Sequence, residues 1–177
     1  FLLLQLGMLQ RRAKLRCCSA PSFERVGKRD GLIGRFFDFL PFSLTNAQDR
    51  VLSEIENDLI SSEPMARLVQ GDVGCGKTVV AIAALLTSVE SGWQGALMAP
   101  TEVLAGQHYR NLCKWLPQLH VSVDLLTGST SRIRRRQILD DLKNGSLKIL
   151  LGTHALIEDP VSFNRLGLVV VDEQHRF

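Results

Sequence analysis

Hydrophobic residues recur at helical spacing in some stretches of the chain and form short continuous runs in others. The helical spacing predicts helices at residues 1–16, 32–40, 46–61, 77–90, 102–115 and 131–143. The continuous runs predict strands at residues 66–70, 96–99, 121–126, 147–151 and 168–171. Apolar strands that alternate with helices are typical of a mostly parallel sheet with helices on both faces. The pattern therefore predicts an α/β fold preceded by a helical segment.

The first part of the chain differs from the rest. Residues 1–16 place Leu2, Leu6 and Leu9 on one helix face, and residues 17–31 have the Ser, Pro and Gly content of a linker. We interpret this part as a linker helix that packs on a part of the protein outside this chain. A role at a membrane surface or on nucleic acid is the alternative. The first residue is Phe rather than Met, so we expect an internal piece of a longer protein.

Composition and charge narrow the class of protein only slightly. The chain of 177 residues is 45% hydrophobic and 22% charged, which is typical of a folded globular domain. Its net charge of +3 favours a polyanionic partner without establishing one. The 4 cysteines show no CxxC spacing, so we expect no zinc site. The apolar start is too short to cross a bilayer, and its basic residues follow the apolar run, unlike in a signal peptide. We therefore expect no membrane segment.

One segment has the spacing of a phosphate-binding loop, GxxxxGK(S/T). The loop comprises Gly71, Asp72, Val73, Gly74, Cys75, Gly76, Lys77 and Thr78. Its glycines let several backbone N–H groups converge on one anion, and the following helix adds the positive end of its dipole. Lys77 would bring an ammonium to the outer phosphates, and the Thr78 hydroxyl would bind Mg²⁺. A glycine-rich turn before a buried helix is the alternative.

Two acidic residues, Asp172 and Glu173, directly follow the last apolar strand. The Asp172 carboxylate can hold Mg²⁺ beside Thr78, and the Glu173 carboxylate can orient and deprotonate an attacking water. Lys77, Asp172 and Glu173 are therefore the catalytic candidates. Two solvated acids after an edge strand are the alternative.

Small and polar residues follow the other strands, at the edge where α/β sheets bind ligands. These candidates for contact with a nucleic-acid backbone are Thr101, Glu102, Gly128, Ser129, Thr153 and His154. Backbone N–H groups at such positions bind phosphates without reading bases. Each hydroxyl is also a common helix cap, which is the alternative for each residue taken alone.

The helix predicted at 131–143 begins with a run of arginines, at Arg132, Arg134, Arg135 and Arg136. The helix dipole disfavours cations at this end. We interpret the run as a solvated basic face, and an external anion that compensates the charge is the alternative.

Several segments together resemble the RecG-type DNA helicases of superfamily 2. The segments are PFSLTNAQ at 41–48, the phosphate loop at 71–78, APTE at 99–102, GTHAL at 152–156 and DEQHRF at 172–177. The transcription-repair coupling factor is the nearest alternative, but Glu102 and Gln174 are more similar to RecG. Two residues depart from the family pattern: Cys75 in the loop, and Gly106, where a Glu or Gln is usual.

The resemblance implies more than the residues alone establish. Residues 41–177 would be the first RecA-like motor lobe, and residues 1–40 the linker after a wedge domain. Gln48 would read the adenine edge of ATP with Phe42 beside the ring, while Gln174 and His175 would couple nucleotide state to DNA. The implied cofactors are ATP and Mg²⁺, and the implied partners are branched duplex DNA (forks and Holliday junctions), the wedge domain and a second motor lobe. The implied place of action is the bacterial nucleoid in the cytoplasm.

The resemblance also predicts what this chain does alone. The second lobe supplies an arginine finger in this family, so we expect weak ATP binding and negligible hydrolysis by the chain itself. Two other classes remain as alternatives: a nucleotide-binding switch or kinase that shares only the loop, and a DNA-binding module without enzymatic activity.

Overall fold

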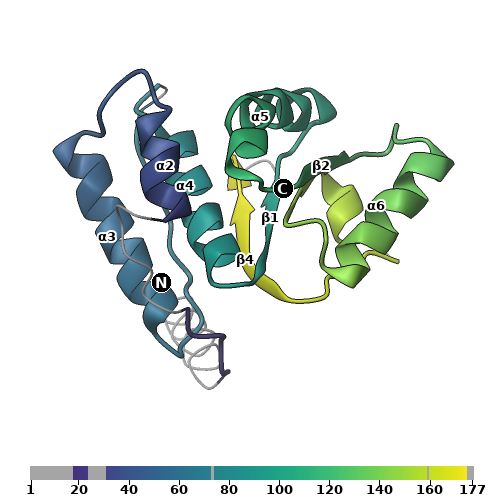
Figure 1. Ribbon diagram of the computed structural model, residues 1–177, viewed down its shortest axis with the longest axis horizontal. Coiled ribbons are helices and arrows are strands. Elements are labelled where there is room, and N and C mark those ends of the chain that lie inside the picture. The colour runs from purple at the N-terminus through teal and green to yellow at the C-terminus, as the bar shows by residue number, and fades with distance from the viewer. Residues whose placement is uncertain (1–17, 24–30, 73, 159, 175–177) are drawn as a thin grey trace, which may run out of the picture. The chain divides into compact units, whose positions relative to one another are not determined.

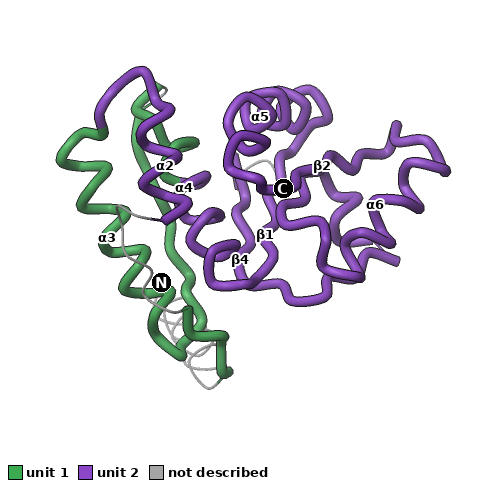
Figure 2. Tube along the Cα trace, in the orientation of Figure 1, with its two compact units in different colours: residues 1–25, 44–80 green, residues 26–43, 81–177 purple. Residues whose placement is uncertain are grey.

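The structure, a computed structural model, describes residues 18–23, 31–72, 74–158 and 160–174. The chain divides into two compact units (Figure 2). Unit 1 comprises residues 1–25 and 44–80, and unit 2 comprises residues 26–43 and 81–177. The predicted helix at 1–16 and most of the predicted linker lie outside the described residues. The division into a linker of 1–40 and a lobe of 41–177 stays a prediction.

Unit 2 is built on a parallel sheet of four strands in the order β2-β3-β1-β4. The strands are β1 (Gln94–Met98), β2 (Val123–Leu126), β3 (Ile149–Gly152) and β4 (Leu166–Val171). Every residue of β1 and β3 is buried, as expected for central strands of a parallel sheet. The carboxyl ends of all four strands therefore meet at one edge, which we call the carboxyl edge.

Helices connect these strands and cover the sheet (Figure 1). After β1 come α5 (Glu102–Trp115) and the 3₁₀ turn η1 (Leu116–Leu119), and after β2 comes α6 (Arg132–Asn144). The chain moves one way along the sheet through α5 and the other way through α6, so right-handed crossovers place these helices on opposite faces. A cluster that includes Ile138, Leu142 and Leu150 packs α6 against the sheet.

The short helix α2 (Leu32–Asp38) completes unit 2 with η2 (His154–Leu156). The Leu32 N–H donates to Glu90 Oε1 at 2.8 Å, which satisfies one free donor at the start of α2. The Phe36 ring is fully buried and meets the Trp115 ring edge-on, with centroids 5.7 Å apart. The Glu90 carboxylate at the start of the helix and the aromatic contact thus stabilise a helix too short to be stable alone.

Unit 1 contains α3 (Asn46–Ile60) and the phosphate loop that leads into α4 (Lys77–Glu90). Thr45 caps α3 in a capping box, because its hydroxyl accepts from the Gln48 N–H and its own N–H donates to Gln48 Oε1. Helix α4 begins in unit 1 and continues into unit 2, where Ile82, Leu85 and Leu86 are fully buried. Both helices confirm the sequence-based expectation.

One predicted strand is wrong. Residues 66–70 form no strand, and the Leu68 side chain is 67% exposed. Arg67 interrupts the apolar run, and its guanidinium bonds Glu54 and Asp58 of α3 at 2.6 and 2.7 Å. A strand needs a paired neighbour as well as a suitable sequence, and these residues pair with no described strand. The other predicted helices and strands of the described residues are confirmed, with ends shifted by a few residues.

Among the described residues, no helix combines the length and the hydrophobicity that crossing a bilayer requires.

Candidate nucleotide and DNA-backbone sites

The phosphate loop lies in unit 1 and has the backbone that its glycines predict. Gly74 and Gly76 have φ angles of 83° and 84°, in the left-handed region that favours glycine. The Lys77 ammonium donates to the carbonyls of Gly71 and Asp72 at 2.7 and 2.8 Å. The positive charge therefore lies against the loop, where phosphate oxygens would bind. Val73 lies outside the described residues.

Cys75, the departure from the family pattern, lies inside this arrangement. The Lys77 ammonium is 3.8 Å from the Cys75 sulfur. A Cβ atom on Gly71 would approach the same sulfur to 2.5 Å. Gly71 therefore provides the room that the Cys75 side chain occupies. Thr78 follows in the first turn of α4 and is half-buried.

Gln48 joins the start of α3 to the loop. Its amide oxygen accepts from the Thr45 N–H, and its amide nitrogen donates to the Cys75 carbonyl at 2.9 Å. A Cβ atom on Gly76 would lie 2.2 Å from that nitrogen. Gln48 thus fixes the loop relative to α3, a role that the sequence did not suggest. Its contact with adenine stays a prediction, as does that of Phe42, whose side chain is half exposed in unit 2.

The acidic pair lies in unit 2 at the end of β4, and Asp172 is held on three sides. Its N–H donates to the Met98 carbonyl at 2.8 Å, and its Oδ1 accepts from the Glu173 N–H at 3.0 Å. Its Oδ2 lies 2.7 Å from Nε2 of His108, a buried residue of α5. Glu173 has a φ of 48°, an uncommon value outside glycine that is typical of functional sites.

His108 is the functional candidate that sequence reasoning missed. Its Nδ1 is buried and has no hydrogen-bond partner among the described residues. The proton therefore belongs on Nε2, where it is donated to the Asp172 carboxylate, since a buried N–H without an acceptor costs more than a buried lone pair. The sequence contained a signal for it, because His108 lies at helical spacing between Ala105 and Leu112 on the buried face of α5.

The residues predicted to contact DNA are joined across two strand ends. Glu102 at the start of α5 accepts from the Ser129 N–H at 3.1 Å and from the Ser129 hydroxyl at 2.7 Å. These hydrogen bonds lower the pKa of the Glu102 carboxyl from its ordinary value of 4.5. Glu102 therefore fixes the turn after β2, and a Cβ atom on Gly128 would lie 3.2 Å from its Oε1.

The other predicted contacts lie at the same carboxyl edge. Thr101 caps α5, with its hydroxyl accepting from the Leu104 N–H at 3.2 Å. Thr153 and His154 follow β3, which lies between β2 and β1, and the His154 side chain is exposed. Gln174 is exposed after the acidic pair, and His175 lies outside the described residues.

The oxygen donors present suit Mg²⁺ better than a metal that needs a protein cage. The described residues contain no group of three or more His, Cys, Asp or Glu that could hold a metal ion. Mg²⁺ keeps several waters and binds through one or two protein oxygens together with substrate phosphates. The Asp172 carboxylate in unit 2 and the Thr78 hydroxyl in unit 1 are each an oxygen donor of that kind.

Comparison with known proteins gives the family. Residues 45–177 match the DEAD/DEAH box helicase family, so the chain belongs to that family. The chain is 54% identical over its whole length to the ATP-dependent DNA helicase RecG of Synechocystis sp., and 50% identical to that of Bacillus subtilis. It covers 21% and 26% of those proteins, so it spans about a fifth to a quarter of their length. The resemblance to RecG-type helicases is confirmed.

A solved structure supports the fold. The structure of RecG bound to a three-way DNA junction matches with a TM-score of 0.91 and 46% identity, covering 99% of this chain and 24% of that one. The α/β fold with a parallel sheet is therefore that of a RecA-like helicase lobe.

Proposed function

We propose that this chain is a motor lobe of an ATP-dependent DNA helicase that remodels branched duplex DNA. The observation that carries the proposal is the position of α5 between two sites. The helix begins with Glu102, which fixes the Ser129 turn, and continues to His108, which holds Asp172. One rigid helix thereby joins the proposed DNA-contacting edge to the proposed nucleotide-binding carboxylate. The similarity to RecG over the whole chain supports the same function.

In the nucleotide half, each residue has a separate role. The loop N–H groups and the Lys77 ammonium would bind the ATP phosphates, and Thr78 with Asp172 would hold Mg²⁺. When bound, Mg²⁺ supplies charge that offsets the negative charge of the phosphates. The Glu173 carboxylate would accept a proton from the water that attacks the terminal phosphorus, while the bond to ADP breaks. His108 would act as a positioning residue for Asp172.

In the DNA half, the carboxyl edge would hold a phosphate backbone. Thr101, Ser129, Thr153 and His154 offer hydroxyl, imidazole and backbone N–H groups that suit phosphate oxygens. Glu102 carries a negative charge, so its contribution would be to fix the Ser129 turn. Gln174 and His175 would relay nucleotide state to this edge. A second motor lobe and a wedge domain of the same protein would complete the machine at the bacterial nucleoid, in the cytoplasm.

The test uses the full-length protein that carries this chain. Its ATPase rate is measured with forked, linear duplex and single-stranded DNA, and without DNA. We expect forked DNA to give the highest rate and Lys77→Ala to abolish it. A rate with forked DNA equal to that without DNA would contradict the helicase proposal and favour a nucleotide switch or kinase.

A further inference from the structure

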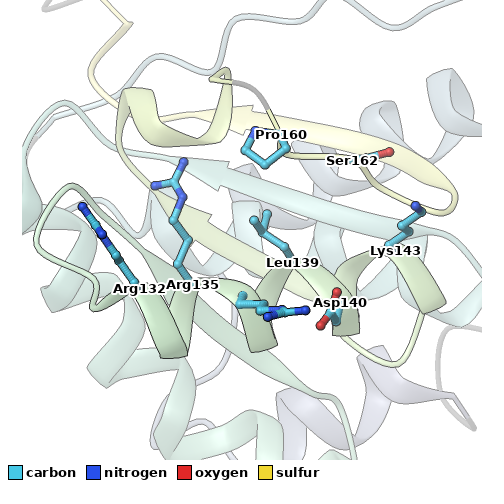
Figure 3. A pocket seen from close by; sticks show the side chains of 8 residues that line it. Arg132, Arg135, Leu139, Asp140, Lys143, Pro160 and Ser162 are labelled. Atoms are coloured by element: carbon cyan, nitrogen blue, oxygen red, sulfur yellow. The ribbon is translucent and has the colours of Figure 1, made fainter.

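A basic groove runs along α6, on the side that faces the segment between η2 and β4. It has a volume of about 390 Å³, and its cationic lining comprises Arg132, Arg135, Arg136 and Lys143. Figure 3 shows Arg132 and Lys143 at opposite ends of the groove, with Leu139 between them and Pro160 and Ser162 on the facing segment. The four cations, all on α6, therefore line one side of a concave surface that a ligand can enter.

The charge in the groove is poorly compensated. One carboxylate, Asp140, lines it, and Arg135 lies 3.8 Å from Glu158. Within the described ranges, Arg132, Arg136 and Lys143 have no ion pair or side-chain hydrogen bond. Arg134 does not line the groove, and its guanidinium is paired with Asp124 at 2.5 Å. The arginine that does not line the groove is thus neutralised, and most of those that line it are not.

This placement of charge is unfavourable without an anion. Arg132 and Arg136 are one helical turn apart, and like charges at that spacing repel each other. Both also lie near the start of α6, where the helix dipole disfavours cations. A bound anion would relieve both effects.

We infer that the α6 groove binds the sugar–phosphate backbone of a DNA strand, as an extension of the carboxyl edge. This inference rests on the proposed function. Helix α6 starts directly after the turn that contains Ser129, so the groove continues from that edge. From Arg132 to Lys143 the helix rises about 16 Å, which matches about five nucleotides along one strand of B-form DNA.

The chemistry of the lining favours a nucleic acid over an acidic protein segment. Guanidinium groups bind phosphates through paired hydrogen bonds, and three of the four cations are arginines. Protein partners need buried apolar anchors, whereas two of the eight lining residues, Leu139 and Pro160, are apolar.

The test compares the full-length protein that carries this chain with its Arg132→Gln/Arg136→Gln variant in binding a 30-base-pair duplex DNA between 50 and 200 mM salt. Each lost phosphate contact reduces the salt slope by about 0.9, so the double variant should lose a slope of about 1.8. The ratio of the DNA affinity of the unmodified protein to that of the variant should then fall about twelve-fold across this salt range. Arg132→Lys/Arg136→Lys retains the charges and should retain most of the slope.

The matched control is Arg110→Gln/Lys114→Gln, which removes two exposed charges at the same spacing on α5, outside the groove. It should leave the slope unchanged, and thermal unfolding verifies that all variants fold. An unchanged salt slope in the α6 variant, or an equal loss of slope in the control, would contradict DNA binding in the groove. Either result would leave the proposed helicase function intact. Displacement of the duplex by polyglutamate more readily than by unlabelled duplex would also contradict DNA binding in the groove. No binding of duplex by the full-length protein at 50 mM salt would instead contradict the proposed function itself.

Discussion

The Asp172 carboxylate shows how far a single residue depends on distant ones. Its place after an apolar strand is visible in the sequence, but its orientation comes from His108, 64 positions earlier in the chain. A ligand that is hydrogen-bonded from behind keeps one geometry and binds metal more tightly. His108 is therefore the residue at which the proposed Mg²⁺ role of Asp172 can be tested without removing the ligand itself.

Replacing His108 by Ala should raise the Mg²⁺ concentration that gives half-maximal ATPase in the full-length protein. Loss of such a partner typically costs 10–100-fold in metal affinity or activity, because the carboxylate becomes free to turn. His108→Gln, which retains an amide N–H near the Nε2 position, should recover part of the loss. Gln107→Ala is the matched control, since Gln107 is exposed on the same helix. An unchanged Mg²⁺ dependence in His108→Ala would contradict the positioning role.

The Glu102 carboxylate should make folding stability depend on pH. Its pKa is lowered in the folded chain by hydrogen bonds from Ser129, so its contribution to stability is present above its ordinary pKa of 4.5 and is lost as pH falls through the folded value. We expect a higher melting temperature for the unmodified chain than for Glu102→Gln at pH 7, and a gap that closes as pH falls below 4.5. A difference in melting temperature that is constant with pH would exclude this role of the Glu102 carboxylate.

At the scale of elements, local patterns predicted the helices well and one strand wrongly. Helix α5 was predicted at its observed bounds, because its cap at Thr101 and its apolar spacing are local signals. Residues 66–70 resemble a strand locally, but pairing with a neighbour is not encoded in five residues, and Arg67 instead bonds α3. In the observed sheet β4 is an edge strand, with Val169 51% exposed.

The candidate site also contains residues that local patterns predict and residues whose contacts form only in the folded chain. The phosphate loop and the acidic pair could be read from spacing, since the chemistry fixes which residues must be adjacent. The partners that hold these residues in place could not, because Gln48 reaches Cys75 and Glu102 reaches Ser129 only in the folded chain. Sequence patterns thus identified the groups that would meet a ligand and missed those that position them.

Because Gln48 joins α3 to the loop, replacing Gly76 should destabilise the chain more than replacing Gly74. Gly74→Ala and Gly76→Ala both force a left-handed residue, which costs roughly 1–2 kcal/mol. Only Gly76→Ala also places a methyl group against the Gln48 amide, whereas nothing lies within 4 Å of a Cβ atom at Gly74. Gly76→Ala should therefore lower the free energy of unfolding more than Gly74→Ala in urea titrations.

A second substitution separates the two effects. Gln48→Ala removes the amide that the new methyl group would meet, so it should recover part of the loss in Gly76→Ala and none in Gly74→Ala. If both glycine variants lost the same free energy of unfolding and Gln48→Ala recovered none of it, the Gln48 side chain would move aside easily and would not fix the loop.

At the scale of the whole molecule, the chain holds the groups that would bind ATP and those that would contact DNA, but it spans only about a fifth to a quarter of its RecG relatives. In the proposed machine an arginine from the second motor lobe completes the ATP site, and such a residue contributes about 10³–10⁵ in rate. We therefore expect this chain alone to bind a fluorescent ATP analogue weakly. Its hydrolysis rate should be at least about 10³-fold below that of the full-length protein with forked DNA.

Adding the second lobe as a separate chain should restore part of that rate, and a version of that lobe without its arginine finger should not. This comparison distinguishes a missing catalytic group from a loop that is simply misfolded, because a misfolded loop would respond to neither. DNA-stimulated turnover by the chain alone, at a rate comparable to the full-length protein, would show that Lys77, Asp172 and Glu173 suffice. The division of catalysis between two lobes would then be wrong for this protein.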